Sequence, residues 1–208
     1  KKVLILGSIG FLASIIQSVL VTSNKINRSN CKIISVSQSQ PYGILKDLIS
    51  ISKDIKFIKK DLSQTDNLKF LNKYKFDFIF HCATYGQPSK WMQQGIKTIS
   101  LNTELLKYLL DKATKDNSRI MFFSSVDVYG ELKNKKAPVD ENFQPQFRNM
   151  NRIPYKFSKL LGEELCSLYK KEFNTKVYVV RAAHTYGPGQ GLNDKRAICD
   201  FLRDAIFK

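Results

Sequence analysis

Residues that build metal sites and disulfide frameworks are scarce in this chain of 208 residues. There are two histidines, His81 and His184, and the four cysteines include no Cys-x-x-Cys pair. This spacing excludes the common zinc sites and a small domain held together by disulfides, so we expect no metal and four reduced thiols. The cysteines are Cys31, Cys82, Cys166 and Cys199.

Long apolar runs are lacking as well. No stretch is long enough to cross a bilayer, and none has the layout of a secretory signal. We therefore expect a cytoplasmic protein without a membrane partner. Hydrophobic residues make up 43% of the chain and charged residues 25%, which is typical of a soluble globular domain.

Acidic residues are the scarcer charge, 18 against 34 lysines and arginines, and the formal net charge is +16. The excess comes from lysines spread over nearly every segment, without an arginine-rich patch. This distribution favours a solvated surface over a nucleic-acid partner, and its positive field would attract an anionic substrate. A nucleic-acid-associated protein is the alternative, which salt-dependent retention on DNA would support.

Short apolar runs alternate with segments of helical periodicity. Strands are expected at residues 3–6, 33–36, 57–61, 76–82, 120–125 and 177–181, and helices at 11–23, 96–113, 155–169 and 197–207. The alternation predicts an α/β fold with a doubly wound parallel sheet of the Rossmann kind. Segment 133–154 is the longest without periodicity, and we expect it to flank the active site.

A glycine-containing turn follows the first expected strand and opens the first helix. Gly7 permits a tight turn, Gly10 lets backbone N–H groups approach a pyrophosphate, and Ala13 allows close packing of helix on strand. The turn predicts a dinucleotide site, the alternative being a junction that needs glycine for geometry alone. At the end of the second strand stand Ser37 and Gln38 instead of an acid, so the choice between NAD and NADP stays open.

Tyr155 and Lys159 are four residues apart and share one face of an expected helix. An ammonium group near a phenol lowers the phenol pKa from its usual value of about 10, which fits Tyr155 as an acid and base. Ser125 ends the fifth expected strand, where its hydroxyl could polarise a substrate hydroxyl or ketone. The alternative for Ser125 is an ordinary turn or capping serine.

These landmarks together resemble the extended short-chain dehydrogenase/reductases, in particular the NAD-dependent nucleotide-sugar epimerases, dehydratases and decarboxylases. The matching motifs, in chain order, are Gly7-x-x-Gly10-Phe11-Leu12-Ala13, Asp61-Leu62, His81-Cys82-Ala83, Asn102-Thr103, Ser124-Ser125-Val126-Asp127-Val128-Tyr129-Gly130, Tyr155-x-x-x-Lys159 and Arg181-Ala182-Ala183-His184-Thr185-Tyr186-Gly187-Pro188. The resemblance implies oxidation of a nucleotide-linked sugar at C4 by hydride transfer to bound NAD(P), then epimerisation, dehydration or decarboxylation. The alternatives are a nucleotide-sugar reductase that uses NAD(P)H and a non-catalytic dinucleotide-binding module.

The resemblance also implies roles for single residues. Tyr155 would be the base, Lys159 would bind the nicotinamide ribose, and Ser125 would orient the C4 hydroxyl. The residues expected to bind the cofactor are Gly7, Gly10, Phe11, Leu12, Ser37, Gln38, Asp61, Leu62, Cys82, Ala83, Thr84, Asn102, Tyr155 and Lys159. His184 takes the place of the family's usual asparagine and is expected to contact substrate. Asp61 also fits a helix cap.

The reaction subtype stays open. Dehydratases of the family have a Thr-Asp-Glu run where this chain has Ser125, Val126 and Asp127. Val126 cannot protonate a leaving hydroxyl, which weakens the 4,6-dehydratase interpretation, whereas Asp127 remains a candidate catalytic base. Decarboxylases tend to have Glu at the position of Asp127, and an epimerase needs only Ser125, Tyr155 and Lys159.

The resemblance further implies how the chain is organised. Residues 1–208 would form the dinucleotide-binding and catalytic domain and end at the start of a truncated substrate-binding region. The family's usual small C-terminal substrate domain would be largely missing. The expected partners are a nucleotide sugar and a second copy of the chain in a homodimer.

Overall fold

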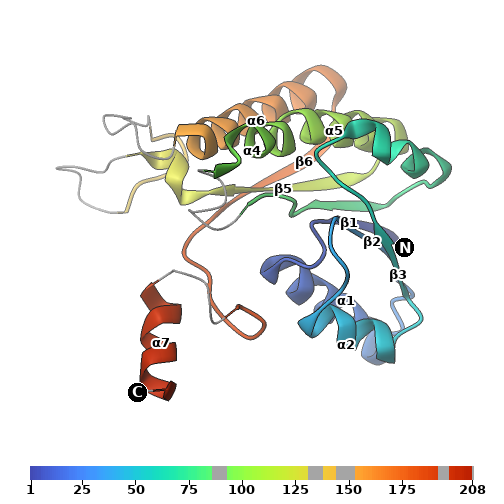
Figure 1. The fold of residues 1–208 in the computed structure, drawn as a ribbon. Coiled ribbons are helices and arrows are strands. Elements are labelled where there is room, and N and C mark those ends of the chain that lie inside the picture. Colours follow the sequence, from blue (N-terminus) through green and yellow to red (C-terminus); the bar gives the residue numbers. More distant parts are fainter. Residues whose placement is uncertain (86–92, 131–137, 144–152, 192–196, 208) are drawn as a thin grey trace.

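A computed structural model describes residues 1–85, 93–130, 138–143, 153–191 and 197–207. Its six strands form one parallel sheet in the order β3-β2-β1-β4-β5-β6 (Figure 1). The strands are β1 (Lys2–Leu6), β2 (Lys32–Ser37), β3 (Ile55–Lys59), β4 (Phe78–His81), β5 (Arg119–Ser125) and β6 (Lys176–Ala182). The α/β fold with a doubly wound parallel sheet is thereby confirmed.

Helices cover both faces of the sheet (Figure 1). One face carries α1 (Phe11–Asn27) and α2 (Gly43–Ile51), and the other carries α4 (Gly95–Asn102), α5 (Glu104–Asp116) and α6 (Ile153–Phe173). The other helices in the described residues are α7 (Ala197–Phe207) and the two 3-10 segments η1 (Thr65–Lys73) and η2 (Val126–Tyr129). Within the described residues, none of these helices combines the length and apolar character needed to cross a membrane.

Each face of the sheet has its own hydrophobic core, because strands buried on both sides place alternate residues in opposite layers. The cluster under α5 and α6 includes Leu4, Leu6, Val36, Ile79, Leu105, Leu109, Ile120 and Phe122. The cluster under α1 and α2 includes Val3, Ile5, Ala13, Val21, Ile33, Leu45 and Leu48.

The strand order predicts where a ligand-binding crevice would lie. The chain builds outward from β1 in one direction through β2 and β3, and in the other through β4, β5 and β6. In open sheets of this kind, ligands bind beyond the carboxyl ends of the strands where the direction of building reverses. That point lies between β1 and β4; of the expected site residues, Gly7 and Gly10 follow β1, Cys82 to Thr84 follow β4, and Ser125 ends β5.

The helix expected at 96–113 is wrong as a single element, because the structure divides it into α4 and α5 at Thr103. Thr103 has φ −122° and ψ −68°, and its hydroxyl donates to the Ile99 carbonyl at 2.8 Å. The break leaves Asn102 fully buried, with its amide nitrogen 3.0 Å from Ser158 Oγ on α6. A tertiary contact therefore interrupts a pattern that is locally helical.

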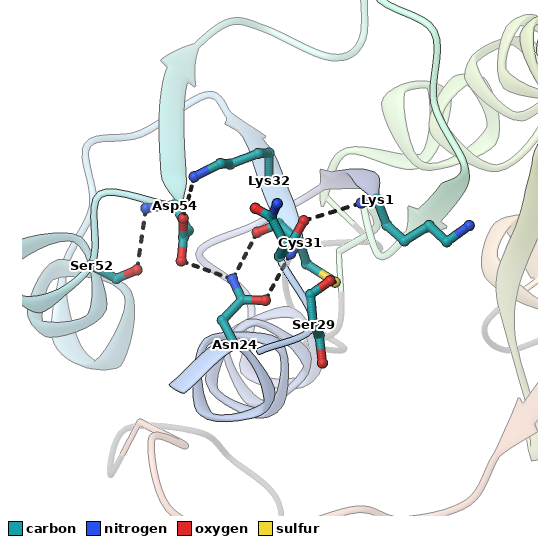
Figure 2. Close-up of polar contacts among 8 residues, drawn as sticks. Lys1, Asn24, Ser29, Cys31, Lys32, Ser52 and Asp54 are labelled. Atoms are coloured by element: carbon teal, nitrogen blue, oxygen red, sulfur yellow. Dashed lines mark hydrogen bonds and ion pairs between the residues drawn. The ribbon is translucent and has the colours of Figure 1, made fainter. Parts of the chain in front are cut away.

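A network of hydrogen bonds lies at the end of the sheet where β2 and β3 begin, opposite the carboxyl ends of the strands (Figure 2). The Asn24 amide nitrogen donates to the Cys31 carbonyl and to Asp54 Oδ2, both at 2.8 Å, and its oxygen accepts from the Cys31 N–H at 2.7 Å. Lys32 lies 2.6 Å from Asp54 Oδ1, and this hydrogen bond is the main reason that the pKa of Asp54 is lowered. The network joins α1, β2 and the start of β3, away from the crevice.

Helix α6 packs closely on β5 and α4 at Gly162. A Cβ atom there would lie 2.6 Å from the Phe122 ring and 3.0 Å from the Asn102 carbonyl oxygen. We expect Gly162→Ala to lower the free energy of unfolding by about 1–3 kcal/mol through overpacking. Gly95→Ala is the control, because its Cβ would meet only the Pro154 side chain at 3.4 Å. Equal denaturation midpoints for the two variants would contradict this close packing.

Candidate active site

The turn after β1 lies against the segment that follows β4. Gly7 has φ +72°, and a Cβ atom there would lie 2.7 Å from the Ala83 Cα and N atoms and from the Cys82 carbonyl oxygen. Only glycine fits a left-handed conformation with backbone this close. The structure thus brings Gly7, Cys82 and Ala83 together, and their contact with a cofactor stays a prediction.

The amino terminus of α1 is open to an anion. Gly10 occupies the N-cap position without a side-chain cap, and the first turn, which begins with Phe11 and Leu12, holds no acidic residue. Amides of a first helical turn have no partner within the helix and carry the positive end of its dipole. Ser8 is fully buried, and its hydroxyl has no protein partner among the described residues. These features fit the pyrophosphate of a dinucleotide.

The sequence interpretation missed Gln17, whose side chain hydrogen-bonds to the backbone of this turn. Gln17 is fully buried on α1, and its amide nitrogen donates to the Ser8 carbonyl at 2.8 Å and to the Ala13 carbonyl at 3.0 Å. Its amide oxygen accepts a hydrogen bond from the Ser35 hydroxyl on β2. The available signal was a polar residue one turn after Ala13, on the face of α1 that meets the sheet.

Of the residues expected to bind the cofactor at the ends of β2 and β3, Asp61 and Leu62 contact their own neighbours in the chain or the core. Ser37 is buried and Gln38 is exposed. The Asp61 carboxylate accepts from the Ser63 N–H at 3.0 Å and from the Ser63 hydroxyl at 2.8 Å, and the backbone hydrogen bond is the main cause of the lowered Asp61 pKa. Asp61 therefore organises its own turn. The alternative of a helix cap is wrong, because Gln64 is the N-cap of η1 and no side chain caps that helix. Leu62 belongs to the core, and the adenine contacts expected of both residues stay predictions.

The catalytic candidates converge at the carboxyl end of β5. The Lys159 ammonium donates to the Phe123 carbonyl at 2.6 Å and lies 5.8 Å from the centre of the Tyr155 ring. The Ser125 hydroxyl accepts from the Asp127 N–H at 3.1 Å, so Ser125 is the N-cap of η2, the local role that the alternative interpretation gave it. Lys159 and Phe123, 36 residues apart in sequence, thus meet near the end of β5, two residues before Ser125.

Lys159 lies in surroundings that disfavour its charge. It is 2% exposed, and its ammonium sits 4.5 Å from the centre of the Phe122 ring. Burial lowers the pKa of Lys159 from its ordinary 10.5 to about 7, and only partial compensation comes from Cys82, Cys166 and Glu163. A lysine whose pKa is about 7 changes charge near neutral pH.

This environment predicts a pH dependence of stability. Between pH 7 and 10.5 the unfolded chain holds a proton on Lys159 that the folded protein has lost, so the free energy of unfolding should rise with pH. Above about pH 9 the thiols of Cys82 and Cys166 act in the opposite direction, because desolvation raises their pKa from 9.0 to about 12.

The measurement is urea denaturation of the wild type and of Lys159→Met between pH 7 and 9. We expect the difference in unfolding free energy, wild type minus variant, to increase across this range, since the other groups cancel in the comparison. A difference that stays constant or decreases with pH would show that Lys159 keeps its ordinary pKa.

Asn102 connects the catalytic helix to the crevice. Besides Ser158, its amide nitrogen faces Thr84 Oγ1 at 3.3 Å, and the Ser158 hydroxyl donates to the Tyr155 carbonyl at 2.9 Å. The Asn102 amide oxygen is buried without a protein partner in the described part of the chain. The structure therefore brings Asn102 and Thr84 to the site, and one unpaired acceptor remains there.

The two histidines differ sharply. His81 is buried, its Nε2 atom lies 2.9 Å from the Leu101 carbonyl oxygen, and burial lowers its pKa to about 3, so the ring is neutral and structural. His184 is exposed and lies two residues beyond Ala182, which pairs with Ser125 in the sheet. Its substrate contact stays a prediction.

Two further expectations concern the surroundings of the site. In the described ranges, no group of three or more His, Cys, Asp and Glu side chains could hold a metal ion. Of the segment 133–154, which we expected beside the active site, only 138–143 and 153–154 are described. The rest lies outside the described residues.

Comparison with known proteins places the chain among related sequences and folds. The family model described as "NAD dependent epimerase/dehydratase family" matches residues 3–206. The chain is 30% identical over 198 residues to a Bacillus subtilis (strain 168) protein named as an uncharacterized UDP-glucose epimerase, YtcB, covering 91% of this chain and 58% of that protein. It is 29% identical over 131 residues to UDP-glucuronic acid decarboxylase 1 of Xenopus tropicalis, covering 62% of this chain and 31% of that protein.

Solved structures share the fold. The UDP-glucuronic acid 4-epimerase of Bacillus cereus in complex with NAD has a TM-score of 0.72 at 24% identity, over 91% of this chain and 59% of that one. The dTDP-glucose 4,6-dehydratase DesIV of Streptomyces venezuelae, with NAD bound, has a TM-score of 0.81 at 19% identity, over 99% of this chain and 62% of that one. The chain thus spans less than two thirds of the length of these relatives.

Proposed function

The chain belongs to the NAD dependent epimerase/dehydratase family, and from that membership we propose that it is an enzyme which oxidises a nucleotide-linked sugar at C4 with NAD. Epimerisation, dehydration or decarboxylation of the oxidised sugar then completes the reaction. Residues 1–208 correspond in this proposal to the dinucleotide-binding and catalytic part of the relatives.

The observation that carries the proposal is the position of Lys159, beside the Tyr155 ring and at the Phe123 carbonyl of β5, the strand that ends at Ser125. Lys159 Nζ lies 5.8 Å from the Tyr155 ring centre and is held by the Phe123 carbonyl, two residues before Ser125. The Gly7 turn opens at the same edge of the sheet, after β1.

Each group has a defined chemical task. Tyr155 accepts the proton of the sugar C4 hydroxyl, and the Lys159 ammonium stabilises the phenolate that does so. Ser125 holds the same hydroxyl in line through its own hydroxyl group. NAD bound along the Gly7 turn would accept the hydride that leaves C4. The Ser8 hydroxyl and the first-turn amides of α1 would hold its pyrophosphate.

The subtype depends on the turn that follows Ser125. Val126 has no proton to give to a leaving hydroxyl, so we rank C4 epimerisation and decarboxylation ahead of 4,6-dehydration. Asp127 is partly exposed in η2 and would serve as the additional base where the reaction needs one. The names of the relatives, an epimerase and a decarboxylase among them, support this order.

The proposal extends to partners and location. We expect a homodimer, supported by exposed apolar side chains on the neighbouring helices α4 and α6, among them Ile96, Ile99, Phe157 and Leu161. We expect the cytoplasm as its place of action, since all four cysteines are described and each is a free thiol. Nucleic acid is not part of the proposal; retention on DNA that falls with salt would oppose it.

The test is a substrate panel. The protein is incubated with NAD and with UDP-, GDP-, CDP- and dTDP-sugars, including UDP-glucuronic acid and dTDP-glucose, and products are identified by mass and NMR. We expect at least one nucleotide sugar to change at C4. NAD binding without conversion of any sugar would instead favour a non-catalytic dinucleotide-binding module.

A further inference from the structure

Arg181 joins several elements at the carboxyl end of β6, where it pairs with Ser124 in the sheet. Its guanidinium holds the Glu163 carboxylate through Nε at 3.1 and 3.2 Å and through Nη2 at 2.7 Å. Its Nη1 donates to the Glu141 carbonyl at 2.9 Å, and its Cζ lies 4.7 Å from the centre of the Tyr129 ring. The side chains of Arg181 and Glu163 are only 21% and 14% exposed.

The partners of Arg181 lie on elements that contain Lys159 or follow Ser125, or between these elements. Glu163 lies one turn after Lys159 on α6. Tyr129 ends η2, which begins directly after Ser125. Glu141 lies in the described stretch 138–143, between η2 and α6, and its neighbour Phe143 packs on Tyr129 with ring centres 6.5 Å apart.

Arginine is suited to this position for geometric reasons. A planar guanidinium binds a carboxylate with two parallel hydrogen bonds, donates to a third acceptor and stacks on an aromatic ring at the same time, which an ammonium cannot do. The Glu163 hydrogen bonds raise the pKa of Arg181, so the group stays charged throughout the working range.

We propose that Arg181 is a positioning residue, which clamps η2 and segment 138–143 onto the catalytic helix so that Ser125 and Asp127 face Tyr155 across the sugar. This inference rests on the proposed function. Arg181 itself touches neither cofactor nor sugar in this proposal. Its effect passes through the turn after Ser125 and through Glu141.

The experiment compares Arg181→Lys with Arg119→Lys. Both changes keep the charge, but Arg119 lies at the amino-terminal end of β5, where its guanidinium stacks on Phe78 at 5.6 Å. Two quantities are measured, the hydrogen exchange of backbone amides and the steady-state kinetics with the converted nucleotide sugar. NAD affinity is measured in parallel.

We expect Arg181→Lys to speed exchange at 126–130 and 138–143 and to lower kcat by about tenfold or more, since small displacements of reacting groups are costly. NAD affinity and exchange in α1 should stay unchanged, and Arg119→Lys should match the wild type in every measurement. Unchanged exchange at these segments, or unchanged kcat, would overturn the proposal.

Failure of the proposed function gives a different pattern. If the wild type converts no nucleotide sugar, kcat cannot be measured and the proposed function fails. The exchange arm then decides the clamp: faster exchange at 126–130 and 138–143 in Arg181→Lys alone supports it, and identical exchange in both variants overturns it.

Discussion

Tyr155→Phe is expected to lower kcat by about 10²–10⁴-fold, the usual contribution of a positioned acid or base, while the Kd for NAD changes by less than about twofold. The substitution removes one hydroxyl and leaves the ring 5.8 Å from the Lys159 ammonium, so the packing of α6 is kept. Turnover of the nucleotide sugar is measured by NMR and NAD binding by calorimetry.

The matched control is Tyr178→Phe, because the Tyr178 side chain on β6 is exposed and lies outside the catalytic group. This variant should keep wild-type kcat. If Tyr155→Phe also turns over at the wild-type rate, another group is the base and the role given to Tyr155 is wrong. If both variants lose activity together, the loss reflects general damage to the fold.

Gly7→Ala is expected to raise the Kd for NAD by about tenfold or more and to lower the free energy of unfolding. The left-handed conformation at φ +72° costs an alanine about 1–2 kcal/mol, which lowers the stability, whereas the loss of NAD affinity comes from displaced backbone and is tenfold for every 1.4 kcal/mol. The added Cβ also meets three backbone atoms of Cys82 and Ala83 at 2.7 Å, which can be relieved only by moving the crevice wall.

Gly43→Ala separates the two contributions. Gly43 has φ +52°, but a Cβ atom there would meet nothing within 4 Å. This control should lose only the stability that the left-handed conformation costs and should bind NAD as the wild type does. Wild-type NAD affinity in Gly7→Ala would contradict the placement of the cofactor along this turn.

The fold was predictable because it depends on local periodicity. Alternating apolar runs and helical segments predicted the parallel sheet, and the glycine turn and Tyr155 with Lys159 predicted the site. The break at Thr103 was not predictable, because the segment is helical by its own pattern and the break serves a contact between Asn102 and Ser158.

The contacts that support the site residues could not be predicted from the sequence either. Gln17 reads as one polar residue in a helix, and its role appears only when Ser8 and Ser35 are placed beside it. Arg181 was visible as part of a motif, but the chain around Glu141 had to be positioned before its contacts could be known. Such partners are set by tertiary packing, which spacing along the chain does not encode.

The most direct test of the central claim is a single-turnover experiment with NAD-loaded protein and a nucleotide sugar that it converts, following the absorbance of the reduced nicotinamide. Oxidation at C4 predicts that this absorbance rises in the wild type before product appears and stays flat in Tyr155→Phe. Product formation without any reduction of the nicotinamide would contradict the account.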